Sequence, residues 1–462
     1  MSLIRLLCSS PPVRHSNGQR HLPKTCREEQ PLRKAKCSHF CGTSLEKSTS
    51  DPGISMKTKD NDNMSLDQPL CSTATHRVGG LRRLLLILAG ALIMGSPIRL
   101  AAAESTQTLT AALQPFVANH TLAGAVVLVA SSDRVLALDA VGYMDIAANR
   151  PMRTDALFWI ASQSKCMTVA ALMMLVDEGK VKLDDPVEKY LPEFKGQWVK
   201  AEGDAEHELL KQPVHPITVR NVLSHTSGLP FSSPIEQPTL DVLPLAARVR
   251  SYAMLPLEFE PDSKYAYSNA GINTAGRIIE VVSGMPYEQF MDERLFRPLG
   301  MKDTTFWPNS KQVRRLAKSY KANAAKDGLE ETTITQLRYP LTDHTREPMP
   351  AGGLFSTAAD VARFCKMMLN RGELNGKRYL SEAAVSQMTA RQTPDTVKEK
   401  YGLGLSIGDG EFGHGGAYAT NMTIDTQHGL IFVWMVQHAG FPGDGEKSRD
   451  AFMQAAKAAF AR

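Results

Sequence analysis

The patterned part of this chain favours β-strands at its two ends and helices in between, and this arrangement limits the folds open to it. Residues 124–130 and 135–143 are rich in Val, Leu and Ala and flank the turn-forming segment Ser131-Ser132-Asp133-Arg134, which predicts an antiparallel hairpin. Further strands are predicted at residues 401–407, 411–414, 419–425 and 430–437. We therefore expect an α+β fold: one antiparallel sheet formed from both ends of the mature chain and flanked by helices, with an inserted, mostly helical domain.

The first hundred residues have the composition of a leader rather than of a folded domain. Three arginines, at positions 77, 82 and 83, precede an apolar run at residues 84–94, and three alanines at 101–103 offer a cleavage site, which predicts a secretory signal peptide at residues 77–103. The run is too short to span a membrane, so we expect an exported protein, periplasmic or extracellular, with no stable membrane span after signal removal. Residues 1–76 lack hydrophobic periodicity and are expected to be a disordered extension or a misassigned start.

Charge and cysteine content also change at residue 103. Residues 1–103 hold 15 of the 53 Lys and Arg residues but only 7 of the 48 Asp and Glu residues. Residues 104–462 are therefore slightly acidic and give no electrostatic reason to expect nucleic-acid binding. Of the seven cysteines only Cys166 and Cys365 follow the cleavage site, and we expect two buried free thiols. No Cys or His cluster has the spacing of a metal site, so no metal is expected.

The tetrad Ser162-Gln163-Ser164-Lys165 opens a strongly apolar stretch that predicts a buried helix ending at Gly179. A serine at a helix N-terminus lies among unsatisfied backbone N–H groups, and a lysine three residues later lies on the same face. Burial disfavours the ammonium form, so Lys165 is expected to take or share the proton of Ser162 and make its oxygen nucleophilic. The alternative is an ordinary N-cap serine with a solvated lysine nearby.

Two further motifs supply what an acyl-enzyme mechanism needs, a proton donor for the leaving group and an oxyanion hole. In Tyr267-Ser268-Asn269, a tyrosine near Lys165 would lose its proton more easily and serve as base and then acid, while the amide would donate to Lys165, Tyr267 or a substrate carbonyl. The alternative is a turn Asn beside a packing Tyr.

The third motif is His414-Gly415-Gly416-Ala417, where paired glycines would let a ligand backbone approach a strand of the C-terminal sheet. The N–H groups of Ala417 and Ser162 would then form the oxyanion hole, and an acyl chain would bind by strand addition. A simple hairpin turn is the alternative for this glycine pair.

These motifs resemble, in order and spacing, those of the serine β-lactamase and penicillin-binding-protein superfamily, most closely its class C β-lactamase-related branch of esterases and D-stereospecific peptidases. The segments 217–229, 296–301 and 351–357 are also similar to that branch. The resemblance covers residues 104–462. Within them we expect an α/β part at residues 104–160 and 346–462 and a helical part at residues 161–345.

The resemblance implies a role for each motif residue. Ser162 would be the acylated nucleophile, Lys165 its activator, Tyr267 the general base and acid, and Asn269 the positioning residue. No cofactor is implied. His225 is expected to cap or brace a loop rather than to take part in catalysis.

The third motif departs from the β-lactamase pattern, because His414 stands where a lysine would attract the substrate carboxylate, and a neutral imidazole attracts an anion only weakly. We therefore expect a small-molecule ester, amide or peptide as substrate, with an esterase or broad acyl hydrolase favoured. A D-aminopeptidase or DD-carboxypeptidase is the second alternative and a class C-like β-lactamase the third. Acyl transfer, or a penicillin-binding sensor or scaffold that is acylated without turnover, would share every motif. Residues 196–215 and 307–345 are expected to set substrate size, and the sequence leaves the oligomeric state open.

Overall fold

The structure, a computed structural model, describes residues 109–204 and 206–461. The signal peptide predicted at residues 77–103 and the extension predicted at residues 1–76 lie outside these ranges, so both stay predictions. No helix in the described ranges is both long enough and apolar enough to cross a membrane.

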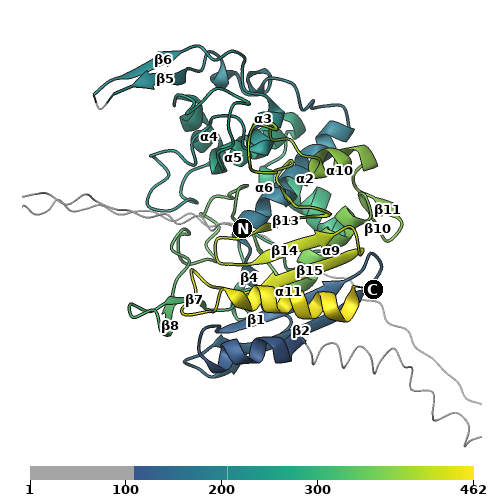
Figure 1. The fold of residues 1–462 in the computed structure, drawn as a ribbon. Coiled ribbons are helices and arrows are strands. Elements are labelled where there is room, and N and C mark those ends of the chain that lie inside the picture. The colour runs from purple at the N-terminus through teal and green to yellow at the C-terminus, as the bar shows by residue number, and fades with distance from the viewer. Residues whose placement is uncertain (1–108, 205, 462) are drawn as a thin grey trace, which may run out of the picture. The chain divides into compact units, whose positions relative to one another are not determined.

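A seven-stranded antiparallel sheet forms the centre of the fold (Figure 1), in the order β12-β13-β14-β15-β1-β2-β3. Its strands are β1 (Gly124–Ala130), β2 (Val135–Asp145), β3 (Arg150–Pro151), β12 (Ser406–Ile407), β13 (Glu411–Gly415), β14 (Asn421–Asp425) and β15 (Leu430–Met435). β1 joins the two groups, because it pairs with β2 on one side and with β15 on the other. The predicted α+β class, with a sheet made from both ends of the chain, is confirmed.

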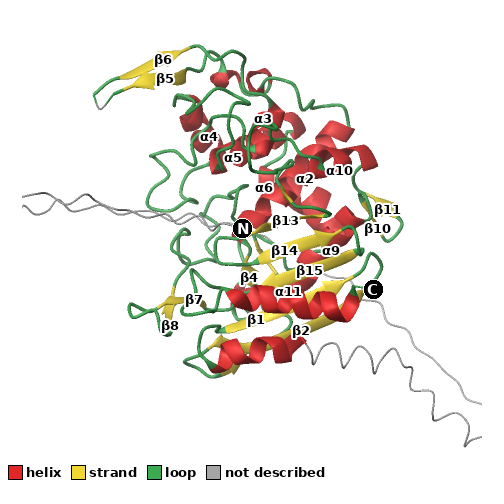
Figure 2. Ribbon diagram, in the orientation of Figure 1, coloured by secondary structure: helices red, strands yellow, loops and turns green. Residues whose placement is uncertain are grey.

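Helices cover both faces of this sheet (Figure 2), so β1 and β15 are buried along their whole length. Alternate side chains of a strand point to opposite faces. Val127 and Trp434 pack on one face with Phe452 of α11 (Lys447–Phe460) and with the helix at residues 109–118. Val126 and Val433 point to the other face, which α9 (Ala358–Leu369) covers. Burial on both sides explains why these strands are apolar throughout rather than alternating.

The strand predicted at residues 401–407 is mostly a loop, since only its last two residues, β12, pair with β13. Gly404 accounts for the difference. It has a φ of +68°, and its N–H donates to Leu223 O of α3 (Val219–Ser224) instead of to a strand. A Cβ atom there would lie 2.6 Å from the Val169 side chain, so the segment packs closely on helices and leaves the sheet.

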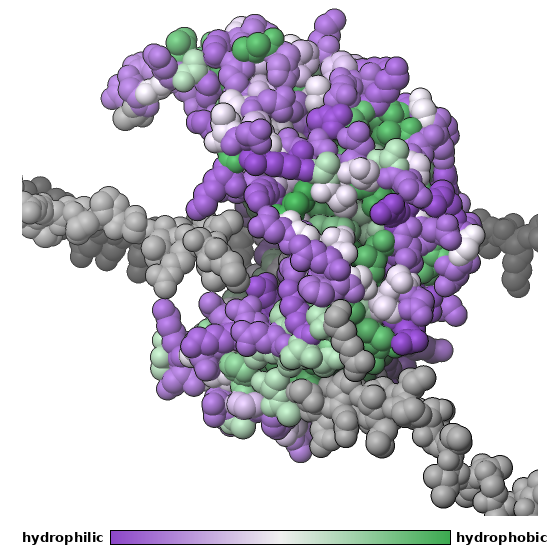
Figure 3. Space-filling model, turned by 45° about the vertical axis from the view of Figure 1, so that its right-hand side comes forward, coloured by the Kyte–Doolittle hydropathy of each residue, from purple (hydrophilic) through white to green (hydrophobic). Residues whose placement is uncertain are grey.

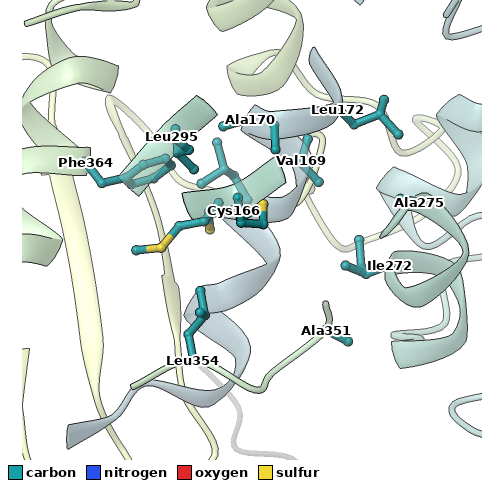
Figure 4. Close-up of a cluster of buried hydrophobic side chains, with 14 of the residues drawn as sticks. Cys166, Val169, Ala170, Leu172, Ile272, Ala275, Leu295, Ala351, Leu354 and Phe364 are labelled. Atoms are coloured by element: carbon teal, nitrogen blue, oxygen red, sulfur yellow. The ribbon is translucent and has the colours of Figure 1, made fainter. Parts of the chain in front are cut away.

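The central helix is α2 (Ser164–Asp177), which follows a short 3₁₀ turn, η1 (Ala161–Gln163). It is buried from Ser164 to Leu175, as its all-round apolar sequence predicts. Figure 4 shows side chains of α2, of α5 (Asn269–Ser283) and of α9 together in one buried cluster. The helix ends as predicted, because Gly179 has a φ of +71° and the Lys180 N–H donates back to Leu175 O in a Schellman motif. Cys166 and Cys365 are buried and free, which confirms that expectation.

The inserted block lies between β4 (Phe158–Trp159) and β9 (Phe355–Ser356), which pair with each other. Besides α2, α3 and α5 it contains α4 (Leu245–Ala253), α6 (Tyr287–Phe290), α7 (Arg297–Leu299), α8 (Ser310–Val313), η2 (Val187–Lys189), η3 (Pro192–Phe194) and the π-helical η4 (Met291–Phe296). After α9 come the small hairpin of β10 (Glu373–Leu374) and β11 (Lys377–Arg378) and then α10 (Glu382–Thr389). The boundary predicted for the helical part, residues 161–345, stays a prediction.

Two hairpins in this block were not predicted: β5 (Val199–Gly203) with β6 (Glu208–Lys211), and β7 (Ser319–Ala322) with β8 (Leu329–Thr332). Their strands are short and, apart from the half-buried β7, largely exposed, so they carry no regular alternation of apolar and polar residues that would reveal a strand. Both lie in the segments that are expected to set substrate size, residues 196–215 and 307–345. The face shown in Figure 3 is mainly hydrophilic, and its hydrophobic residues form smaller separate areas.

Candidate active site

Ser162 lies where the sheet part meets the central helix. It is the half-buried middle residue of η1, and α2 begins two residues later, so the helix N-terminus predicted here takes the form of a 3₁₀ turn that runs into the α-helix. Ala161 has a φ of +46°, a conformation that strains a residue with a Cβ atom. The turn is held in place from outside, because the Ile160 N–H donates to Leu354 O at 2.9 Å.

Lys165 is fully buried and makes three polar contacts through Nζ. They run to Ser162 Oγ at 3.2 Å, to Asn269 Oδ1 at 2.7 Å and to the backbone oxygen of Ala351 at 2.6 Å. The amide oxygen and the carbonyl oxygen can only accept hydrogen bonds. A neutral amine has two N–H groups and one lone pair, so both N–H groups go to these oxygens and the lone pair faces the Ser162 hydroxyl. This is the geometry of a general base beside a nucleophile.

Removal from water also sets the protonation of this amine. Burial lowers the pKa of Lys165 to about 7, and the neighbouring Cys166 opposes that fall. A large part of the amine is therefore unprotonated at neutral pH. The solvated lysine considered as the alternative is not found.

Tyr267 lies just before α5, and its side chain contacts both Lys165 and Ser162. Lys165 Nζ lies 4.7 Å from the centre of the Tyr267 ring, and the Tyr267 hydroxyl hydrogen-bonds with Ser162. Burial raises the pKa of Tyr267, and the hydrogen bond with Ser162 offsets part of that rise. The expectation that this tyrosine would lose its proton more easily is not met, because removal from water raises its pKa by more than the hydrogen bond with Ser162 lowers it. Tyr267 therefore keeps its proton at neutral pH.

His414 on β13 is a neutral hydrogen-bond acceptor. Its Nδ1 lies 2.6 Å from Gly415 O, which can only accept, so Nδ1 carries the proton and the lone pair of Nε2 accepts a hydrogen bond. Nε2 lies 3.1 Å from the hydroxyl of Tyr401 and 3.5 Å from that of Tyr267. Burial, together with the nearby Lys165, lowers the pKa of His414 to about 4. The neutral imidazole expected from the sequence is therefore the form that this site favours.

Gly416 lets the end of β13 lie against the nucleophile turn. A Cβ atom at this position would be 2.5 Å from Ile160 O and 2.3 Å from Thr420 Oγ1. The Gly416 N–H donates to Thr420 O at 2.7 Å, so this segment is also the turn that leads to β14, as the alternative proposed. Ala417 is exposed, and no protein acceptor for its N–H is found among the described residues. This leaves the N–H free for a substrate oxygen, and the oxyanion hole stays a prediction.

His225 braces the site from behind. It ends α3 with a φ of +62°, and its Nδ1 accepts the Ser268 N–H at 3.2 Å. Its ring packs beside Tyr267 and Tyr401, with ring centres 4.6 and 4.8 Å away. Burial holds the pKa of His225 well below its usual value. This is the structural role expected from the sequence.

Two contributors were not foreseen. Tyr401 is buried beside His414, but it stood in a segment that was predicted to be a strand, and an aromatic residue before a glycine is a weak signal. Ala351 acts through its backbone oxygen, which no pattern of side chains reveals. In the part of the chain that the structure describes, no group of three or more His, Cys, Asp or Glu side chains is placed to hold a metal ion.

Known proteins match this chain over most of the described residues. The sequence profile of the β-lactamase family matches residues 109–457. Protein Rv1367c of Mycobacterium tuberculosis is 32% identical over 355 residues, which cover 69% of this chain and 86% of that protein. Two relatives match over about half of their own length. They are the D-alanyl-D-alanine-carboxypeptidase/endopeptidase AmpH of Escherichia coli (32% identical; 47% of this chain, 50% of that protein) and esterase EstB of Burkholderia gladioli (33% identical; 44% and 52%).

A solved structure has the same fold. Simvastatin synthase LovD from Aspergillus terreus superimposes with a TM-score of 0.66 at 20% sequence identity, over 78% of this chain and 99% of that one. The family profile spans the central sheet, the inserted block and all three motifs. The chain therefore belongs to the β-lactamase family of serine hydrolases.

Proposed function

We propose that this protein is an esterase or broad acyl hydrolase that forms an acyl-enzyme on Ser162. The neutral state of His414 carries the proposal. A lysine here would attract a substrate carboxylate, whereas a buried imidazole with an unprotonated Nε2 offers neither a positive charge nor a hydrogen. The site therefore favours a neutral ester over a β-lactam or a peptide with a free carboxylate.

The contacts around Ser162 support an acylation route in which each group has one task. The Lys165 amine takes the proton of Ser162 Oγ, 3.2 Å away, as this oxygen attacks the ester carbonyl carbon. The electron pair of the C=O bond moves to the oxygen, which the N–H groups of Ser162 and Ala417 stabilise. Tyr267 gives its proton to the leaving alkoxide as the C–O bond breaks, and the Lys165 ammonium returns a proton to Tyr267.

Deacylation repeats these steps with water in place of the alcohol. As the water oxygen attacks the acyl carbon, the water gives a proton to Tyr267, and Tyr267 passes its own proton to the Lys165 amine. The same pair then returns a proton to Ser162 Oγ as the bond to the acyl group breaks. An alcohol or amine that replaces water at this step gives acyl transfer, so added alcohol diverts the product without slowing acylation.

A D-aminopeptidase or DD-carboxypeptidase is the second candidate. AmpH, a D-alanyl-D-alanine-carboxypeptidase/endopeptidase by name, is 32% identical over 47% of this chain. A DD-carboxypeptidase has to bind a terminal carboxylate, which a neutral His414 attracts weakly. This places the peptidase behind the esterase.

Three chromogenic substrates separate these activities: a short p-nitrophenyl ester, a D-alanyl p-nitroanilide and a cephalosporin. We expect the ester to be cleaved fastest and the activity to vanish in Ser162→Ala. Faster cleavage of the anilide would support the peptidase, and faster cleavage of the cephalosporin would show a β-lactamase. One equivalent of covalent acyl group on Ser162 without turnover would show a sensor or scaffold.

We also propose that the protein is exported and loses its leader before Glu104. The arginines, the apolar run and the alanines of residues 77–103 support this. Mass spectrometry of the protein from periplasmic and culture fractions is expected to find Glu104 as the N-terminus. A cytoplasmic protein that retains residues 77–103 would contradict it.

A further inference from the structure

Both oxygens that accept from Lys165 depend on α5. Asn269, at the start of this helix, supplies one of them directly through Oδ1. The other is the carbonyl of Ala351, whose own N–H donates to Asn273 Oδ1 at 3.0 Å. Residues four apart lie on the same face of a helix, so Asn269 and Asn273 present two amides, one turn apart, to the Lys165 side of α5.

The Asn273 amide can adopt only one orientation. Its Nδ2 donates to the Tyr252 hydroxyl at 3.0 Å, and this hydroxyl donates to Glu236 Oε1 at 2.8 Å. Glu236 is also paired with Arg248 across 3.4 Å. A tyrosine hydroxyl has one hydrogen, which goes to the carboxylate, so its oxygen accepts from the Asn273 amide nitrogen. The amide oxygen of Asn273 therefore faces the Ala351 N–H.

This chain of contacts is buried throughout. Asn273, Tyr252 and Arg248 have no exposed surface, and Glu236 is 3% exposed. The loop that carries Ala351 is also packed tightly against α5, because a Cβ atom at Gly276 would lie 2.3 Å from the Pro350 ring. Water has no access to replace a lost partner here, so each hydrogen bond fixes the position of the next group.

We propose that Asn273 is a positioning residue for Lys165: it holds the Ala351 carbonyl where this oxygen accepts one N–H of the amine and leaves the lone pair aimed at Ser162. The inference rests on the proposed role of Lys165 as the general base. Asn273 touches neither Ser162 nor Tyr267 by any hydrogen bond, so it acts only through Ala351.

Loss of the hydrogen bond between Asn273 and Ala351 should change how the reaction rate depends on pH. The titratable groups around Lys165 are Cys166 on its own helix and Tyr267, His225 and His414 on the elements packed against it. Burial disfavours the charged forms of these groups, so the carbonyl and amide dipoles, together with the effect of Cys166, are what favour the ammonium form of Lys165. A displaced Ala351 carbonyl then lowers the pKa of Lys165.

The test compares Asn273→Leu with Asn273→Asp. Two rates are measured against pH: cleavage of the p-nitrophenyl ester, and covalent labelling of Ser162 by a fluorophosphonate. In Asn273→Leu we expect both rates to fall, by up to about 100-fold, because a group moved by about 1 Å is no longer aligned. The pH at the midpoint of the acid limb of the rate–pH profile should be lower than in the wild type. In Asn273→Asp the midpoint moves up, because a carboxylate favours the ammonium.

Thr274→Val is the matched control, since Thr274 is equally buried on α5 and its hydroxyl donates only to Ala270 O of the same helix. It is expected to keep the rate and the midpoint. If Asn273→Leu does not fold, Tyr252→Phe removes only the hydroxyl that orients the amide and should shift the midpoint in the same direction by less.

A folded Asn273→Leu with the wild-type rate and midpoint would overturn the inference, and so would midpoints that stay fixed in both Asn273 variants. Failure of the esterase proposal looks different. In that case the wild type cleaves no ester, yet labelling of Ser162 still reports the state of Lys165.

Discussion

At the scale of single residues, the unusual feature is a lysine whose contacts are all uncharged. Lys165 Nζ touches a hydroxyl, an amide oxygen and a backbone oxygen, with no carboxylate among them. An isolated ammonium is costly to bury, so the group releases its proton at a lower pH instead. In the proposed mechanism, function and stability therefore oppose each other at this position. The neutral amine proposed as the base also lowers the stability of the native state at pH values where the unfolded chain would be protonated.

Lys165→Met is expected to abolish ester cleavage and to change how stability depends on pH. The pKa of Lys165 is lowered from its ordinary value of 10.5 to about 7 in the folded protein, so between these pH values the unfolded state holds a proton that the native state has released. Wild-type stability therefore rises with pH in this window relative to the variant. Calorimetric melting temperatures at pH 7, 8.5 and 10 measure it. Parallel curves for the two proteins would contradict a lowered pKa for Lys165.

His414→Lys should shift the protein towards substrates with a carboxylate. A hydrogen bond to a charged group is worth about 1.5–3 kcal/mol, so the preference for cephalosporin over ester, as a ratio of kcat/KM values, should rise about tenfold or more. The second cation should also move the acid limb to lower pH, because it disfavours the Lys165 ammonium. His414→Gln, which stays neutral, serves as the control. An unchanged preference in His414→Lys would show that residue 414 does not face the substrate.

At the scale of elements, β13 and η1 make the site by lying against each other, and Gly416 permits this contact. Strand β13 carries the imidazole, and the turn after it carries the free N–H of Ala417. The position of the predicted oxyanion hole therefore depends on how the end of β13 packs against η1, and not on any side chain.

Gly416→Ala is expected to push the end of β13 away from Ser162. The added methyl would lie 2.5 Å from Ile160 O, and such overpacking costs about 1–3 kcal/mol of stability. We expect kcat to fall more than KM rises, because the oxyanion donors act in the transition state. Gly408→Ala is the control, since the nearest atoms to a Cβ atom there lie 3.7 Å away. Equal kinetics for the two variants would argue against Ala417 as a donor.

The sequence predicted those elements whose pattern is strong over many residues. The continuous apolar runs of β1 and β15, the all-round apolar α2 and its terminal Gly179 were all identified correctly. The loop at residues 401–405 was missed because apolar residues and glycines that pack on helices resemble a strand. The proton affinity of Tyr267 was predicted in the wrong direction, since the sequence shows which groups approach it but not how completely water is excluded.

At the scale of the whole molecule, a buried ion pair links two distant segments of the inserted block. Arg346 Nε lies 2.7 Å from Asp241 Oδ2, and both side chains are almost wholly buried. The Asp241 carboxylate also accepts the N–H of Arg338, in the segment expected to set substrate size. The Asp241 carboxylate thus connects the segment between α3 and α4 to the segment that follows β8.

Asp241→Ala should destabilise the protein by about 3–5 kcal/mol, because the buried guanidinium of Arg346 keeps its backbone acceptors but loses its only opposite charge among the described residues. The double variant Asp241→Leu with Arg346→Met should lose much less, since neither charge then remains. Urea denaturation of the three proteins gives the comparison. Equal losses for the single and double variants would mean that the two segments are held by other contacts.

One of the two oxygens that accept from Lys165, the proposed general base, belongs to the main chain. A backbone carbonyl is the same group in every amino acid, so sequence drift at position 351 changes the site only through the volume of the side chain, which is buried here. Position 269 is different, because its amide oxygen is part of the side chain. The two contacts have similar lengths but tolerate mutation differently. Position 351 can exchange one small residue for another, whereas position 269 needs a side chain with an amide oxygen.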